Sequence, residues 1–140
     1  MQGFAEENAE NWPQLLVHEA GRRWIEGVRS RLARLPVRVH HSAVARETLG
    51  IAQHERRCIV LAELGRRPLD TLDLLEQIDR MGRELSVIVV ARANQADLEI
   101  PARELGAAAF LTEPMTVADL AGLVELIARV QFGWDKRTST

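Results

Sequence analysis

The sequence predicts one α/β domain built on a parallel sheet, and three observations support this. Two apolar runs, residues 58–62 and 86–91, have the composition of central strands that are buried on both faces. Strand and helix patterns alternate five times along the chain, with short connections. The 140 residues are enough to bury one hydrophobic core. Because parallel strands need crossover connections, this alternation predicts helices on both faces of the sheet.

The chain begins with a short apolar run at residues 14–17, which predicts the first strand. Residues 21–35 predict a helix, because their apolar side chains fall on one stripe at 100° per residue. Pro36 ends this helix, and residues 37–41 alternate in polarity as an edge strand does.

Ser42 is the expected N-cap of a second helix that runs to about residue 54. The central strand at residues 58–62 then ends in a carboxylate, Glu63, and the next helix is expected over residues 71–81. The carboxyl ends of the strands face the functional crevice in an open α/β sheet. Glu63 is therefore expected at the floor of that crevice.

The last third of the chain continues the alternation. Residues 86–91 form the clearest strand pattern, and a helix is expected within residues 94–105, where Pro101 delays its regular start. Small residues at 107–111 predict the fifth strand. Thr116 is the expected N-cap of a final helix that ends at about residue 131.

Composition and charge limit the classes of function. The net charge is −2 and the pI is about 6.1, so neither nucleic acid nor an anionic membrane is an expected partner. Cys58 is the only cysteine, which indicates a reducing compartment. No apolar run approaches the roughly 20 residues of a membrane span, and the acidic N-terminus has no secretory pattern. We expect a cytoplasmic protein with a flexible segment at 1–12, a folded domain at 13–131 and a tail at 132–140.

The run from Gly106 to Pro114, Gly-Ala-Ala-Ala-Phe-Leu-Thr-Glu-Pro, places Gly-Ala, an aromatic residue and proline at distinctive offsets. With the strand ends described above, it resembles the receiver domain of bacterial response regulators. The resemblance covers roughly residues 13–131. It implies a flavodoxin-like, doubly wound three-layer sandwich with five parallel strands in the order 2-1-3-4-5. It also implies a cis peptide bond between Glu113 and Pro114.

The resemblance places the residues of a phosphorylation site on this chain, and most of them are changed. Glu63 takes the place of the phosphoacceptor aspartate, Ala91 that of a hydroxyl residue, and Glu113 that of a lysine. The acidic pair after the first strand is represented by His18 and Glu19. Phosphotransfer to a carboxylate needs a divalent metal and donors that neutralise the phosphoryl oxygens. The sequence therefore predicts a degenerate pocket that lacks the phosphorylation chemistry.

Several roles remain open for this pocket. Glu63 is either a permanent imitation of a phosphorylated aspartate or a strand-end acid that forms an ion pair. Our candidate for the partner in that ion pair is Arg92, whose guanidinium could lie between Glu63 and Glu113. Phe110 occupies the position of the switch aromatic and is either that switch or simply packed. A metal- or ligand-sensing module built on His18, Glu19 and Glu63 is the main alternative, and a flavin-binding enzyme is a third.

The final helix carries more apolar residues than one core contact needs. Leu123, Leu126 and Val130 fall at the margin of its buried face, so they are a candidate interaction surface unless Trp12 or residues 132–134 cover them. The resemblance implies a dimer through this region. We expect a stand-alone, non-enzymatic pseudo-receiver without metal or cofactor, which acts in bacterial signalling by binding a protein partner and forming a homodimer.

Overall fold

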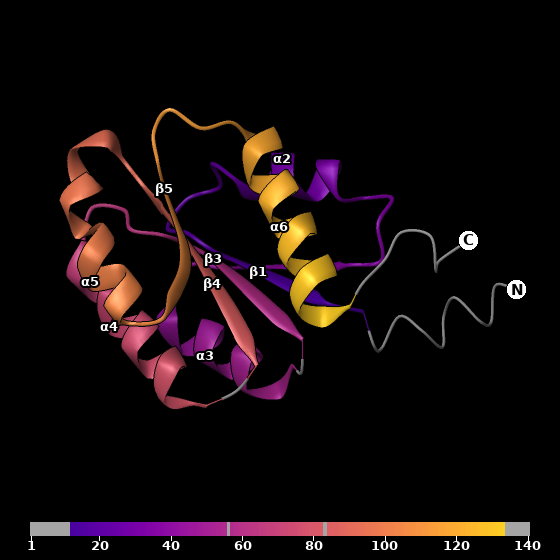
Figure 1. Cartoon of the computed structure of the whole chain (residues 1–140), viewed down its shortest axis with the longest axis horizontal. Helices are drawn as coiled ribbons and strands as arrows, with labels where there is room; N and C mark the ends of the chain where they lie inside the picture. Colours follow the sequence, from indigo (N-terminus) through magenta and orange to yellow (C-terminus); the bar gives the residue numbers. More distant parts are fainter. Residues whose placement is uncertain (1–11, 56, 83, 134–140) are drawn as a thin grey trace, which may run out of the picture.

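A computed structural model describes residues 12–55, 57–82 and 84–133 of the chain. Five strands form one parallel sheet in the order β2-β1-β3-β4-β5, which confirms the predicted fold class and strand order (Figure 1). The strands are β1 (Gln14–His18), β2 (Arg38–Ser42), β3 (Cys58–Glu63), β4 (Leu85–Ala91) and β5 (Ala107–Thr112). The helices are α2 (Ile25–Arg31), α3 (Ala45–His54), α4 (Pro68–Arg80), the 3₁₀ helix η1 (Ala93–Leu98), α5 (Glu99–Glu104) and α6 (Val117–Phe132).

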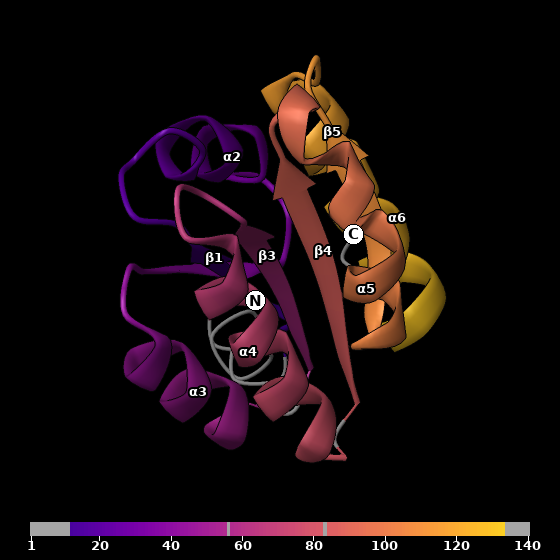
Figure 2. The same cartoon turned by 90° about the vertical axis from the view of Figure 1, so that its left-hand side faces the viewer.

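The helices cover the sheet on both faces and make the three predicted layers. Helices α2 and α6 pack on one face, and α3, α4 and α5 pack on the other (Figures 1 and 2). Each face has its own apolar cluster: Leu15, Ile59 and Ile88 point toward α2 and α6, whereas Leu16 and Val60 point toward the opposite helices. Successive residues of a strand point to opposite faces, so the wholly apolar runs supply both clusters at once.

The first predicted helix is shorter than its apolar stripe suggests. The stripe over residues 21–35 is real, but α2 is regular only over Ile25–Arg31. Before it, Trp24 and Ile25 donate their backbone N–H groups to the Glu19 carboxylate, and after it Leu32 and Leu35 continue to pack on the core from turns. Tertiary contacts therefore preserve the apolar pattern beyond the end of the regular helix.

Two other helix starts differ from the prediction. Ser42 is the last residue of β2 rather than an N-cap, and Val44 takes the cap position of α3. The Ser42 hydroxyl instead accepts a hydrogen bond from the Val44 backbone N–H at 3.2 Å. Helix α4 begins at Pro68 and not at Thr71, because proline is compatible with the first helical turn.

Three other expectations about the fold agree with the structure. Pro101 lies in the first turn of α5, after a 3₁₀ segment, so the regular helix does start late. The peptide bond between Glu113 and Pro114 is cis. Thr116 caps α6: its hydroxyl accepts a hydrogen bond from the Asp119 backbone N–H.

The ends of the predicted domain are only partly described. Residues 1–11 and 134–140 lie outside the described residues, and α6 extends one residue past the predicted limit, to Phe132. In the described part of the chain, no helix is both long and apolar enough to cross a membrane.

Candidate functional site at the carboxyl ends of the strands

The register of the sheet brings the predicted pocket residues to one edge. His18 ends β1 beside Ala62, and Glu63 ends β3 beside Val90. Ala91 ends β4 and is buried beneath this edge. The sequence therefore placed these residues at one edge of the sheet, and the structure adds which groups their side chains contact.

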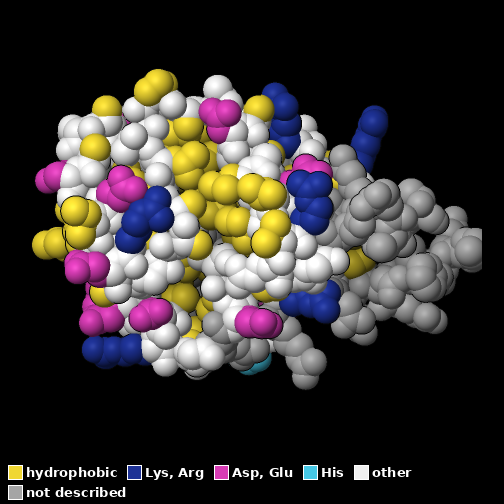
Figure 3. Space-filling view, in the orientation of Figure 1, with side chains coloured by type: hydrophobic (Ala, Val, Ile, Leu, Met, Phe, Trp, Pro, Cys, Tyr) yellow, Lys and Arg dark blue, Asp and Glu magenta, His cyan; other side chains and the backbone are white. Residues whose placement is uncertain are grey.

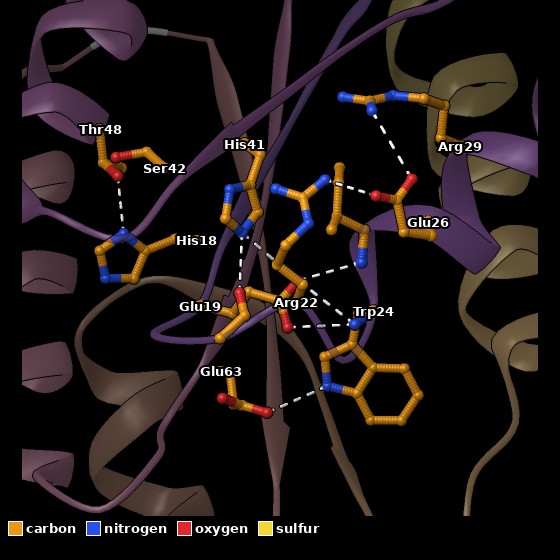
Figure 4. A network of polar contacts seen from close by, with 12 residues as sticks. His18, Glu19, Arg22, Trp24, Glu26, Arg29, His41, Ser42, Thr48 and Glu63 are labelled. Carbon is orange, nitrogen blue, oxygen red and sulfur yellow. Dashed lines mark hydrogen bonds and ion pairs between the residues drawn. The ribbon is translucent and has the colours of Figure 1, made fainter.

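Glu19 is a structural acid and not an open ligand. Its side chain is almost fully buried, at 1% exposed. Its two carboxylate oxygens accept hydrogen bonds from the backbone N–H of Trp24 at 3.0 and 3.2 Å and from that of Ile25 at 3.0 Å (Figure 4). The His41 Nε2 lies 3.6 Å from one of these oxygens. Glu19 thus satisfies the first amides of α2, a task that a buried helix start requires.

Glu63 has a hydrogen-bond partner that the sequence did not suggest. The indole N–H of Trp24 donates to the Glu63 carboxylate at 3.2 Å (Figure 4). Trp24 is 4% exposed and belongs to the loop between β1 and α2. The same residue therefore joins two acids of the pocket, Glu19 through its backbone and Glu63 through its ring.

Glu113 is neutralised by Arg23, which corrects our expectation for Arg92. The Arg23 Nη2 donates to the Glu113 carboxylate at 2.6 Å. This hydrogen bond is the main reason that the pKa of Glu113 lies below its ordinary value, and the Arg92 charge makes a smaller contribution. Arg92 itself is exposed and forms no ion pair with a described residue, whereas Glu113 binds Arg23 and Glu63 binds Trp24.

Arg23 also stacks over the Trp24 ring, with 4.5 Å between its guanidinium carbon and the ring centroid. The sequence analysis singled out neither residue, because it treated residues 21–35 as one helix with an apolar stripe. A usable signal was present: the segment immediately after a parallel strand lies at the crevice, and here that segment contains Arg-Trp.

His18 is held by a hydroxyl rather than by an acid. Its Nδ1 lies 2.6 Å from the Thr48 Oγ1 (Figure 4). Burial, and to a smaller extent the neighbouring His41, lower the pKa of His18. Among the described residues, no group of three or more His, Cys, Asp or Glu side chains is arranged to hold a metal ion. His18, Glu19 and Glu63 share one edge, but His18 contacts Thr48, whereas Glu19 and Glu63 both accept hydrogen bonds from Trp24.

The other predicted residues lie away from this network. Phe110 is half-buried and packs against the apolar cluster beneath α4 and α5. On α6, Leu126 is 47% exposed and Val130 is 75% exposed, whereas Leu123 is half-buried against the core. The described residues, Trp12 included, thus leave Leu126 and Val130 accessible.

A five-stranded sheet in this order with helices on both faces defines a flavodoxin-like α/β fold, and solved structures narrow this to the receiver-domain fold of response regulators. The chain is similar to a response regulator from Thermotoga maritima, with a TM-score of 0.72 and 20% identity over 83% of this chain and 97% of that chain. It is also similar to a response regulator receiver protein from Pseudoalteromonas atlantica, with a TM-score of 0.69 and 22% identity over 84% of this chain and 98% of that chain. For a CheY-like response regulator receiver domain protein from Methanospirillum hungatei, the TM-score is 0.74 and the identity 17%, over 87% of this chain and 98% of that chain.

No protein-family model and no curated protein matches the sequence. These three solved structures are below 25% identity to the chain, so the likeness establishes the fold and not the chemistry of the site. The function therefore has to be argued from the residues of this chain.

Proposed function

We propose that this protein is a pseudo-receiver, a receiver-fold module of bacterial signalling that is not phosphorylated and that acts by binding other proteins. The Arg23–Glu113 ion pair is the observation that carries the proposal. By the resemblance to receiver domains, Glu113 occupies the position of a lysine that would meet an incoming phosphoryl group. Here that position presents a carboxylate, and the cation beside it is already paired.

The acceptor position supports the same conclusion. Glu63 receives a hydrogen bond from Trp24, whose ring is buried, and Ala91 offers no hydroxyl group. Stabilising a transferred phosphoryl group requires donors that point at its oxygens and a metal held by free carboxylates. The Trp24 indole and the Arg23 guanidinium, which donate to Glu63 and Glu113, already bind acids of the protein itself. Glu19 is likewise occupied by the amides of α2.

A module without a phosphoryl switch must act through its surface. We propose a cytoplasmic protein with no catalytic residue, which pairs with a second copy through α6 and presents the remaining surface to another signalling protein. The exposed apolar side chains of α6 support this part of the proposal, because such groups on soluble domains usually mark contacts.

Phosphorylation can be tested directly. The purified chain is incubated with acetyl phosphate and magnesium, and separately with beryllofluoride and magnesium, and is then analysed by intact mass and sedimentation. We expect no phosphoryl adduct and no change in association state. The triple variant Glu63→Asp, Ala91→Thr, Glu113→Lys serves as a control for reagent activity. An adduct on the unmodified chain, or a beryllofluoride-dependent change in association, contradicts the proposal.

Calorimetry with magnesium, manganese and calcium separates this proposal from a metal-sensing module. A pseudo-receiver whose carboxylates are occupied by Trp24, Arg23 and the amides of α2 is expected to give no binding heat. Saturable heat that disappears in a Glu63→Gln variant supports a metal site instead.

A further inference from the structure

The outer face of α6 carries a row of four residues that the described part of the chain leaves uncovered. The row consists of Ala118, Gly122, Leu126 and Val130, which follow one another at every fourth position. Four of the five residues that α6 buries, Leu120, Ala121, Val124 and Ala128, lie on the opposite side of the helix, and the fifth, Phe132, is its last residue. Figure 3 shows a hydrophobic patch over α6 and the neighbouring strand β5.

The side chains of this row are small at its N-terminal end and large at its C-terminal end. Its first half has Ala118 and Gly122, and its second half has the exposed Leu126 and Val130. An added Cβ at Gly122 meets nothing within 4 Å, whereas at Gly27 it meets Val117 at 2.8 Å. Packing within the chain therefore requires glycine at position 27 and not at position 122. The recess at Gly122 is unused by the chain itself, although glycine is unfavourable within a helix.

We infer that two copies of the chain pair through α6 in an antiparallel arrangement, with the two-fold axis between Gly122 and Leu126. Leu126 of each copy then lies over the Gly122 recess of the other, and Val130 lies toward Ala118. Rows of residues spaced by four interdigitate at a crossing angle of about −50°. A two-fold contact must be self-complementary, and this order of small and large side chains meets that condition only when the helices are antiparallel.

This inference rests on the homodimer included in the proposed function, and it adds the register and direction of that dimer. Charge favours the same direction. Asp119 lies near the start of the row and Arg129 near its end, and Arg129 forms no ion pair with a described residue. The antiparallel arrangement brings the acidic end of one helix to the level of the basic end of the other. A parallel pair places like charges and like helix-dipole ends at the same level.

Cysteine cross-linking tests the direction. Full-length Gly122→Cys and Leu126→Cys proteins are mixed and mildly oxidised, and the products are separated by mass. The antiparallel register predicts the mixed 122–126 disulfide in several-fold excess over either homodisulfide, since disulfide formation requires close Cα atoms. The native Cys58 is fully buried and gives a low background. Homodisulfides in excess, or no cross-link at all, overturn the inference.

Two further variants test the recess itself. Gly122→Leu fills it and is expected to weaken dimerisation about tenfold or more by overpacking the contact, while raising the melting temperature of the monomer. Gly50→Leu, in α3, is the matched control, because an added Cβ there also meets nothing within 4 Å. It is expected to leave dimerisation unchanged. Dimerisation that survives Gly122→Leu contradicts the register.

An exposure-matched pair tests the large end of the row. Val130 is 75% exposed on α6 and Ile100 is 71% exposed on α5, and both are β-branched. Val130→Glu is expected to yield a monomer in sedimentation, and Ile100→Glu to leave the dimer intact. An unmodified chain that sediments as a monomer at micromolar concentration overturns both the inference and the proposed dimer. It leaves the absence of phosphorylation to be decided by the acetyl phosphate experiment.

Discussion

The Arg23 guanidinium donates to the Glu113 carboxylate at 2.6 Å, and the two residues come from opposite ends of the chain. Arg23 follows β1, and Glu113 follows β5, four strands later in the sequence. The pair therefore links the loop before α2 to the loop before α6, directly above the strand ends. It places a positive charge supplied by the protein itself beside the Glu113 carboxylate at this edge of the sheet.

Replacing Arg23 should change the ionisation of Glu113. Its hydrogen bond is the main cause of the low pKa of Glu113, so Arg23→Ala is expected to raise that pKa toward the ordinary value for glutamate. NMR titration of the side-chain carboxyl measures the shift. The neighbouring Arg22→Ala is the matched control, because Arg22 binds Glu26 and lowers the pKa of that residue instead. A Glu113 titration that does not respond to Arg23→Ala would show that the ion pair is not formed in solution.

Glu19 should contribute to stability far more than its position beside the candidate site suggests. Glu19→Ala leaves the buried N–H groups of Trp24 and Ile25 without acceptors, which is expected to lower the free energy of unfolding by about 2 to 4 kcal/mol. Glu19→Gln keeps one acceptor oxygen and should cost less. Urea unfolding measures both. Glu26→Ala, in the first turn of α2 and exposed, controls for effects of removing an acid. Equal midpoints for Glu19→Ala and Glu26→Ala would contradict the role assigned to Glu19.

The contact between α2 and α6 depends on Gly27. A Cβ at this position meets the Val117 side chain at 2.8 Å, so Gly27→Ala is expected to destabilise the fold by about 1 to 3 kcal/mol. The double variant Gly27→Ala, Val117→Ala should recover part of that loss, because it removes the clashing methyl groups. Thermal unfolding monitored by circular dichroism gives the values.

Gly50→Ala separates this steric effect from helix propensity. Gly50 lies within α3, and an added Cβ meets nothing within 4 Å. The substitution is expected to stabilise the protein by about 0.5 to 1 kcal/mol, since alanine favours the helix. Similar losses for Gly27→Ala and Gly50→Ala would show that close approach of the two helices does not explain the effect.

The fold was readable from the sequence because its evidence is local. Apolar runs, turn residues and the alternation of strand and helix each span a few neighbouring positions, and together they predicted all five strands, whereas the strand order followed from the resemblance to receiver domains. Helix ends were less predictable. Helix α2 stops being regular where Glu19 and the turns after Arg31 satisfy the backbone, and no nearby residue pattern signals this.

The site was readable only in part, for the same reason. The positions of His18, Glu63 and Ala91 follow from the strand ends, which the sequence predicts. Their partners depend on which long side chains cross the crevice. Arg23 and Arg92 flank it on different loops, and only the three-dimensional path of the loop before α2 brings Arg23 to Glu113. The positions of Arg23 and Arg92 in the sequence do not by themselves show which of the two reaches Glu113.

The imidazole of His18 is expected to make the free energy of unfolding depend on pH. Burial and the neighbouring His41 lower the pKa of His18 in the folded protein below its ordinary value of 6.5. Between the two pKa values the unfolded chain binds more protons than the folded one, so the free energy of unfolding rises with pH in that interval. The contribution of His18 to the free energy of unfolding is fully present above the unfolded-state pKa and is lost as the pH falls through 6.5 toward the folded-state pKa. His40, whose pKa is also lowered chiefly by burial, contributes with the same sign.

Urea unfolding across this pH interval measures the slope. His18→Gln removes one of the two titrating groups and is expected to reduce the slope, because glutamine binds no proton in either state. Thr48→Val is the control: it removes the hydrogen bond at the His18 Nδ1 and keeps the imidazole. It should lower stability at every pH while the dependence on pH persists. If His18→Gln and Thr48→Val change the slope equally, the dependence arises from the hydrogen bond and not from protonation of a buried imidazole.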